Sequence, residues 1–134
     1  RGNLMFAKRL KLLRENKGIT REALAQALSV SVSTIGMYEQ GRREPDHDKL
    51  RALAGYFSVS IDYLLGRDLI DVKMKVDPDK VGSLADVERL AGEAMELLNQ
   101  ALAEGVISED QAALSLKLFR QSLLIMMEDN KKHK

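Results

Sequence analysis

The chain has no cysteine, and only 4% of its 134 residues are aromatic. Without thiols it can form neither a disulfide framework nor a thiolate metal site, which agrees with a reducing compartment. The longest uninterrupted hydrophobic run, residues 123–127, is far shorter than the ~20 residues that cross a bilayer, and no signal-peptide pattern opens the chain. We therefore expect a cytoplasmic protein that does not span a membrane.

Groupings of catalytic side chains are also lacking. His47 and His133 are isolated in sequence from each other and from any carboxylates at metal-ligand spacing. Neither a nucleophile beside a base nor a glycine-rich phosphate loop is present in the pattern. We expect no metal site, no cofactor and no enzymatic activity.

Net charge is low, at +1, but the two halves of the chain differ in sign. Residues 1–66 carry eleven Lys and Arg against seven Asp and Glu, a net +4, whereas residues 67–134 carry ten against thirteen, a net −3. A basic surface attracts phosphates, so the first half is the one suited to nucleic acid. The second half is expected to bind something other than DNA.

The middle of the first half predicts two short helices joined by a tight turn. Thr20 is a suitable N-cap for the first helix, in which Leu24 and Leu28 share an apolar face. The pattern breaks after Leu28, and Ser31 can cap a second helix that ends at Gly41. A helix-turn-helix is the expected result.

Three more helices complete an all-α first module. One precedes the pair and ends at Gly18, Asp46 can cap a fourth, and Ser60 begins a short fifth helix that Gly66 terminates. The first helix is amphipathic, and its cationic residues Lys8, Arg9, Lys11 and Arg14 fill the faces that the apolar residues leave. Apolar spacing predicts a core of Phe6, Leu10, Leu13, Leu24, Leu28, Ile35, Tyr38, Leu50, Leu53, Phe57, Ile61 and Leu64.

Several motifs at fixed spacings carry a family resemblance. They are Phe6, Arg9, Leu10, Leu13 and Arg14, then Gly18-Ile19-Thr20, Leu24-Ala25, Ser33-Thr34-Ile35, Tyr38-Glu39-Gln40-Gly41, Arg42-Arg43-Glu44-Pro45, Leu53-Ala54 and residues 60–66. This set resembles the Cro and lambda-repressor type of helix-turn-helix, found in the XRE-type bacterial and phage regulators. It covers about half the chain and implies a five-helix DNA-binding domain over residues 5–66.

The resemblance implies that the second helix of the pair enters the major groove of double-stranded DNA and places Val32, Ser33, Gly36 and Met37 toward the bases. None of these is Arg, Asn or Gln, so bidentate reading of guanine or adenine is excluded for them. Thymine-methyl contacts by Val32 and Met37 and one hydrogen bond from Ser33 remain. Gly36 either lets the helix approach DNA closely or is a neutral small residue, and both readings stay open.

Further positions are implied for phosphate contact and for structure. The expected phosphate contacts are Thr20, Arg21, Ser31, Gln40, Arg42 and Arg43. For Arg42 and Arg43 a solvated loop is the alternative. Arg14 and Glu39 occupy the positions of a structural ion pair that ties the first helix to the end of the recognition helix.

Two serines depart from the family pattern. Ser29, in the central turn, and Ser58, before the last short helix, stand where the family usually has glycine. A left-handed conformation at Ser29 would cost roughly 1 kcal/mol, which a packed core can absorb.

Residues 67–82 are expected to link this domain to a second module. Apolar and polar residues alternate from 69 to 76, with Ile70, Val72, Met74 and Val76 on one side, which is a strand pattern. A lone strand has no partner within the chain. The stretch is therefore either a strand that pairs with its counterpart in a second chain or an extended linker that lies on a helix.

Residues 83–129 predict a hairpin of two helices. Ser83 can cap the first, which stops at Gly105, and Ser108 to Gln111 has capping-box spacing before the second. Residues 123–127 are apolar nearly all round, so we expect a second copy of the hairpin to cover them, with packing on the first module as the alternative. The expected dimer contacts are Leu116, Phe119, Leu123, Leu124, Met126 and Met127.

Two classes of function follow. The favoured one is a sequence-specific DNA-binding regulator, a repressor that acts as a homodimer. The alternative is an interaction protein, such as an antitoxin or an antirepressor-binding subunit, whose C-terminal hairpin holds a protein partner and whose DNA contact is secondary.

Overall fold

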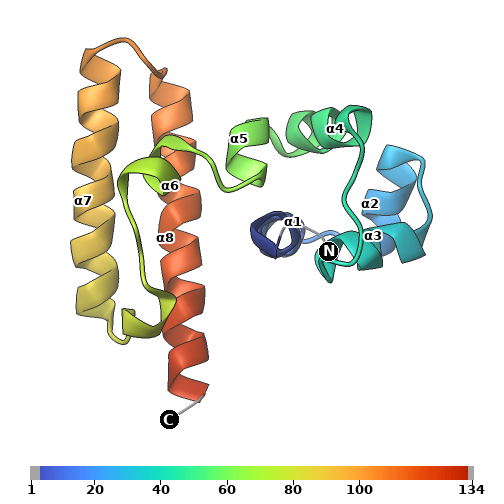
Figure 1. The fold of residues 1–134 in the computed structure, drawn as a ribbon, viewed down its shortest axis with the longest axis horizontal. Helices are drawn as coiled ribbons and strands as arrows, with labels where there is room; N and C mark the ends of the chain where they lie inside the picture. The colour runs from blue at the N-terminus through green and yellow to red at the C-terminus, as the bar shows by residue number, and fades with distance from the viewer. Residues whose placement is uncertain (1–3, 133–134) are drawn as a thin grey trace. The chain divides into compact units, whose positions relative to one another are not determined.

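A computed structural model describes residues 4–132, so His133 lies outside the described residues. The chain divides into two compact units, Arg1–Asp68 and Leu69–Lys134. We call them the helix-turn-helix unit and the hairpin unit. Both are built from helices, as the ribbon in Figure 1 shows.

From residue 4 to residue 68, the part that the structure describes, the helix-turn-helix unit contains five helices. They are α1 (Leu4–Lys17), α2 (Arg21–Leu28), α3 (Val32–Glu39), α4 (His47–Phe57) and α5 (Ile61–Leu64). The four helices after α1 begin at the expected N-caps, because the side chains of Thr20, Ser31, Asp46 and Ser60 each accept a hydrogen bond from the amide three residues later. These caps fix where each short helix starts.

The core of this unit follows the predicted apolar stripe. Phe6, Leu10, Leu24, Ile35, Leu53 and Leu64 are at most 1% exposed, and of the expected core residues Ile61 is half-buried. The rings of Phe6 and Tyr38 meet edge to face with centroids 6.1 Å apart. The packing of α1 on α3 is therefore fixed partly by an aromatic pair.

Arg9 lies outside the apolar stripe of α1 and is nevertheless buried. Its side chain is buried, with its Cζ 4.3 Å from the centroid of the Tyr63 ring, and its Nη1 donates to the backbone oxygen of Tyr63 at 2.5 Å. The planar guanidinium can stack on a ring and donate at its edge at the same time, so the charge is accommodated inside. Arg9 thus ties α1 to α5.

Both serines that replace the family glycines adopt the left-handed conformation. Ser29 has φ 57° and Ser58 has φ 55°, each directly after a helix. The amides of Ser29 and Val30 donate to the last carbonyls of α2, which closes that helix end. The turn keeps its geometry, at the cost of a Cβ in an unfavourable region.

The hairpin unit consists of α6 (Leu69–Lys73), the 3₁₀ helix η1 (Pro78–Lys80), α7 (Leu84–Ala103) and α8 (Glu109–Lys132). Ser83 and Asp86 form a reciprocal capping box at the start of α7. The backbone amides of Gly82 and Ser83 donate to Asp86. The bond from Gly82, followed by hydrogen bonding with the Ser83 side chain, holds the pKa of the Asp86 carboxyl below its usual value. Ser108 and Gln111 exchange the same pair of hydrogen bonds before α8.

The possible strand over residues 69–76 is wrong. Residues 69–73 form α6 instead, and the amide of Met74 donates to the carbonyl of Ile70 at 2.8 Å. An isolated strand would leave its backbone groups without partners, whereas a helical turn satisfies them locally. Ile70 and Met74 are also four residues apart, so the helix places both on one face while Val72 stays 62% exposed.

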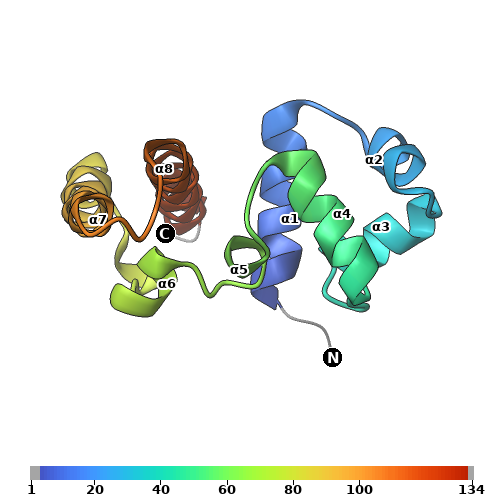
Figure 2. The ribbon, with the colours of Figure 1, turned by 90° about the horizontal axis from the view of Figure 1, so that it is seen from above.

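From residue 69 on, the expected linker is part of the hairpin unit. Ile70 of α6 packs with Ala94, Leu98 and Ala112, and Val81, after η1, packs in a second cluster with Val87, Leu123 and Met127. The side-chain amide of Asn130 donates to the carbonyls of Pro78 and Val81. Figure 2, which looks along α7 and α8, shows α6 against one side of the helix pair.

Within residues 4–132, no helix has the length and hydropathy that crossing a membrane would require.

Candidate nucleic-acid interface

The turn between α2 and α3 is three residues long, from Ser29 to Ser31. Thr20 Oγ1 accepts from the amide of Ala23 at 3.0 Å at the start of α2, and Ser31 Oγ accepts from the amide of Thr34 at 3.1 Å at the start of α3. The left-handed Ser29 turns the chain between them. The result is a helix-turn-helix in which α3 stands where the resemblance implies a recognition helix.

The two faces of α3 are distinct. Ile35 and Tyr38 are buried in the core, and burial raises the pKa of the Tyr38 hydroxyl. On the other face Val32 is 41% exposed, Ser33 is exposed, and Gly36 and Met37 are half-buried. The four residues expected to face the bases therefore lie on the accessible side of the helix, together.

Among the residues that the structure describes, no contact accounts for glycine at position 36. A Cβ placed on Gly36 would meet no heavy atom within 4 Å. Glycine inside a helix costs about 1 kcal/mol relative to alanine, and packing gives no compensation here. The open space over Gly36 is consistent with close approach of another molecule to α3.

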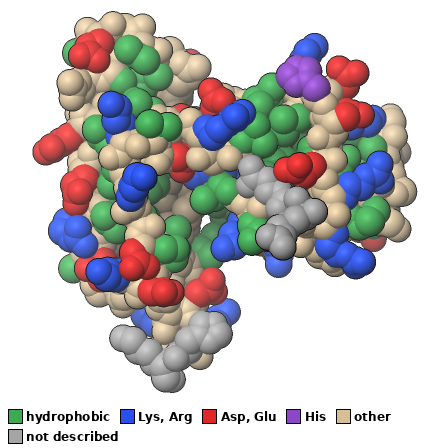
Figure 3. Space-filling view, viewed as in Figure 1, with side chains coloured by type: hydrophobic (Ala, Val, Ile, Leu, Met, Phe, Trp, Pro, Cys, Tyr) green, Lys and Arg blue, Asp and Glu red, His purple; other side chains and the backbone are tan. Residues whose placement is uncertain are grey.

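The expected phosphate contacts lie around both helix starts and beyond the end of α3. Thr20, Ser31, Gln40, Arg42 and Arg43 are exposed. Gly41, with φ 71°, ends the recognition helix and leads into the Arg42-Arg43 loop. In the view of Figure 3, both units carry basic and acidic side chains on their surfaces.

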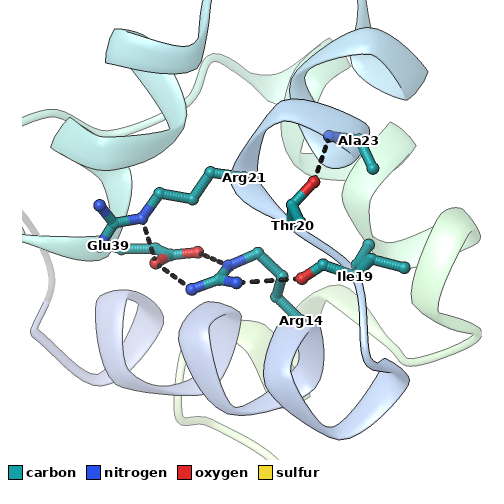
Figure 4. A network of polar contacts seen from close by, with 6 residues as sticks. All are labelled: Arg14, Ile19, Thr20, Arg21, Ala23 and Glu39. Atoms are coloured by element: carbon teal, nitrogen blue, oxygen red, sulfur yellow. Dashed lines mark hydrogen bonds and ion pairs between the residues drawn. The ribbon is translucent and has the colours of Figure 1, made fainter.

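A polar network joins α1, α2 and α3 (Figure 4). Arg14 donates from Nε and Nη2 to the two carboxylate oxygens of Glu39, at 2.6 and 3.1 Å, and from Nη1 to the carbonyl of Ile19 at 3.0 Å. The Glu39 side chain is 1% exposed and that of Arg14 is 12% exposed. The ion pair implied by the resemblance is present, and hydrogen bonding to Glu39 raises the pKa of the Arg14 guanidinium.

Arg21 also belongs to this network, which the sequence did not indicate. Its Nε donates to Oε1 of Glu39 at 3.1 Å, while its side chain is 40% exposed. Arg21 and Glu39 are eighteen residues apart in different helices, so no local spacing could reveal the contact. The sequence shows only that Arg14 and Arg21 belong to the same predicted domain as Glu39.

Comparison with known proteins agrees with this geometry. A helix-turn-helix family model matches residues 10–64. The HTH-type transcriptional regulator ImmR of Bacillus subtilis is 30% identical over 129 residues, which cover 96% of this chain and 99% of ImmR. The chain belongs to the XRE-type family of helix-turn-helix transcriptional regulators.

Two further relatives of this regulator extend into the hairpin unit. The SPbeta prophage-derived regulator YonR of Bacillus subtilis is 34% identical over 108 residues, covering 81% of this chain and 86% of YonR. The cryptic phage CTXphi transcriptional repressor RstR of Vibrio cholerae is 28% identical over 100 residues, covering 73% of this chain and 87% of RstR. The sequence similarity to these relatives is thus not confined to the helix-turn-helix unit.

Not all the dimer contacts expected in α8 of this regulator are accessible. Leu123 and Met127 are 0% and 7% exposed inside the cluster with Val81 and Val87, so their assignment to a dimer contact is wrong. Both side chains are enclosed within the hairpin unit, because residues 76–81 cover one side of α8 while α7 covers another. The remaining expected residues, Leu116, Phe119, Leu124 and Met126, pack partly buried against the two clusters.

Proposed function

We propose that this regulator is a sequence-specific transcriptional repressor that binds DNA in the major groove as a homodimer, in the cytoplasm where bacterial DNA lies. The observation that carries the proposal is the accessible face of α3, with Val32, Ser33, Gly36 and Met37 together and cationic residues next to the helix end. Repression is proposed from RstR, which is named a repressor.

Base reading on this proposal is modest and largely apolar. Val32 and Met37 contact thymine methyl groups, and Ser33 supplies one hydrogen bond. Most of the affinity then comes from phosphates contacted by Thr20, Ser31, Gln40 and the arginines, which position the helix without reading sequence. Two half-sites acting together supply the specificity that one recognition helix lacks.

For the dimer we propose one flank of α7. Leu84 and Met95 are 56% and 48% exposed and stand eleven residues apart, which is about three helical turns, so they share a side of α7. Leu97, which lines a groove with Lys73 and Met74, lies on the opposite flank, next to α6. The flank of Leu84 and Met95 is therefore free of α6.

Charged residues beside this flank suit a two-fold contact. Glu88 and Arg120 form an ion pair between α7 and α8, with the arginine 44% exposed. Glu88 follows Leu84 by one turn, and Arg120 precedes the partly buried Leu124 by one turn. In an isologous interface each copy places Glu88 opposite Arg120 of the other, around an apolar centre.

Sedimentation of the full chain tests this proposal. We expect a dimer at micromolar concentration, and a monomer for the double variant Leu84→Glu, Met95→Glu. Val72→Glu is the control for each single substitution, because it places one glutamate on an exposed apolar residue of α6 and should leave the dimer intact. A wild-type monomer would overturn the homodimer and favour the interaction-protein alternative, in which a different protein covers this flank.

A further inference from the structure

The two arginines that meet Glu39 use their nitrogens differently. Arg14 engages Nε, Nη1 and Nη2, each with an acceptor within the unit. Arg21 contacts Glu39 through Nε, at the base of its guanidinium. Within the part of the chain that the structure describes, its terminal Nη1 and Nη2 groups are left for another acceptor.

The charges in the network are also unequal. One carboxylate faces two guanidinium groups, so the cluster of Arg14, Arg21 and Glu39 carries a surplus of one positive charge. Arg14 is nearly buried and makes the closer, two-point contact with Glu39, which neutralises the acid. The surplus charge therefore resides on Arg21, the more exposed partner.

Arg21 stands at a position that suits an anion. It is the first residue of α2, next to the N-cap Thr20, and the backbone amides at a helix start favour negative charge. Arg14 holds the carbonyl of Ile19, just before that start. The same network thus fixes the beginning of α2 and the direction of the Arg21 side chain.

We infer that Glu39 is a positioning residue for DNA binding: it holds Nε of Arg21 so that Nη1 and Nη2 grip a backbone phosphate in two-point contact. The inference rests on the proposed function and adds to it a role for a buried acid that does not itself touch DNA. A long, free arginine loses rotamer freedom when it binds phosphate, and Glu39 removes that cost in advance.

The test measures affinity against salt concentration for the full chain and a duplex selected from a random DNA pool. Arg21→Lys keeps the charge but lacks the Nε contact and the planar fork. We expect about fivefold to tenfold weaker binding with an unchanged dependence on salt. Arg21→Gln should weaken binding further and reduce the slope of log affinity against log salt by about 0.9 per half-site.

Arg89→Lys is the matched control, since it makes the same change in an exposed Arg–Glu pair of the hairpin unit, where Arg89 Nη1 lies 3.2 Å from Glu93. It should bind like wild type. Binding by Arg21→Lys equal to that of wild type would overturn the inference while leaving the proposed function standing. Absence of salt-dependent DNA binding by the wild type would overturn both.

A double-mutant cycle separates positioning from stability. DNA affinity is measured for the wild type, for Glu39→Gln, and for Arg21→Gln made in each of these two backgrounds. All measurements are made at a temperature at which circular dichroism shows that the proteins are folded. If Glu39 acts through Arg21, removing Arg21 costs less affinity in the Glu39→Gln background than in the wild type. An equal cost in the two backgrounds would show that Glu39 has only a structural role.

Discussion

The two units of this regulator are held together in different ways. In the helix-turn-helix unit, helices of four to fourteen residues are joined by side chains that bridge them: Arg14 to Glu39, Arg9 to Tyr63, and Lys49, whose Nζ donates to the carbonyl of Leu28 at 2.9 Å. In the hairpin unit, helices of 20 and 24 residues meet along a seam of buried Val, Ala, Leu and Met.

This difference follows from helix length. A long helix pair has enough apolar area along its seam to fix its own register, whereas short helices bury little area each and need directional contacts to set their angles. In the unit that must present α3 accurately, the polar bridges between helices are buried or partly buried. In the hairpin unit the Glu88–Arg120 pair between α7 and α8 is exposed. The unit proposed to dimerise has the longer apolar surfaces, which suits that role.

The largest expected effect comes from breaking the polar bridge. Arg14→Ala leaves Glu39 buried with one exposed partner, and we expect the helix-turn-helix unit to lose about 3 kcal/mol of unfolding free energy. Urea denaturation measures the loss, and a double-mutant cycle with Glu39→Gln isolates the pair. Coupling near zero would contradict the account of the bridge.

The next effect tests the seam of the hairpin unit. Ile70→Ala removes a side chain that is 4% exposed in the cluster with Ala94 and Leu98, and we expect about 2–3 kcal/mol of destabilisation from lost burial and the resulting cavity. Val72→Ala, at an exposed position of the same helix, is the control. If the two variants unfold at the same urea concentration, residues 69–73 do not belong to the unit.

Gly36→Ala should move stability and DNA affinity in opposite directions. Alanine gains about 1 kcal/mol in a helix and meets no neighbour here, so the helix-turn-helix unit should melt at a higher temperature. Its DNA affinity should fall, because the new methyl group stands on the face that we propose approaches the bases. Gly55→Ala, in α4 with equally open space, is a control for stability alone. Unchanged affinity would mean that Gly36 is a neutral residue.

The smallest effect concerns the turn. Ser29→Gly relieves a Cβ at φ 57°, and we expect a gain of about 0.5–1 kcal/mol in unfolding free energy. Ser29→Ala keeps the Cβ and should give no such gain. A stabilisation of the same size by both substitutions would show that the serine hydroxyl, and not the backbone conformation, is unfavourable.

These two units also differ in how far the sequence predicted them. In the first, capping residues and apolar spacing are local signals, and Thr20, Ser31, Asp46 and Ser60 begin helices as expected. The contacts of Arg9 with Tyr63 and of Arg21 with Glu39 join distant segments, so spacing alone could not reveal them.

In the hairpin unit the same residues were compatible with more than one structure. Ile70, Val72, Met74 and Val76 alternate like a strand, yet Ile70 and Met74 also fit one helical face, and only the presence of the hairpin decides between the two. The same holds for Leu123 and Met127. Their apolar surroundings indicated burial, but an internal seam and a dimer contact require the same residue types.

Selection of bound sequences from a random DNA pool by the full chain tests the central claim most directly, because it reports recognition and symmetry together. We expect enrichment of an inverted repeat whose half-site centres lie about 34 Å apart, or a multiple of that distance, with thymines opposite Val32 and Met37. Enrichment of a single asymmetric site, or no enrichment at all, would contradict a homodimeric regulator that reads DNA through α3.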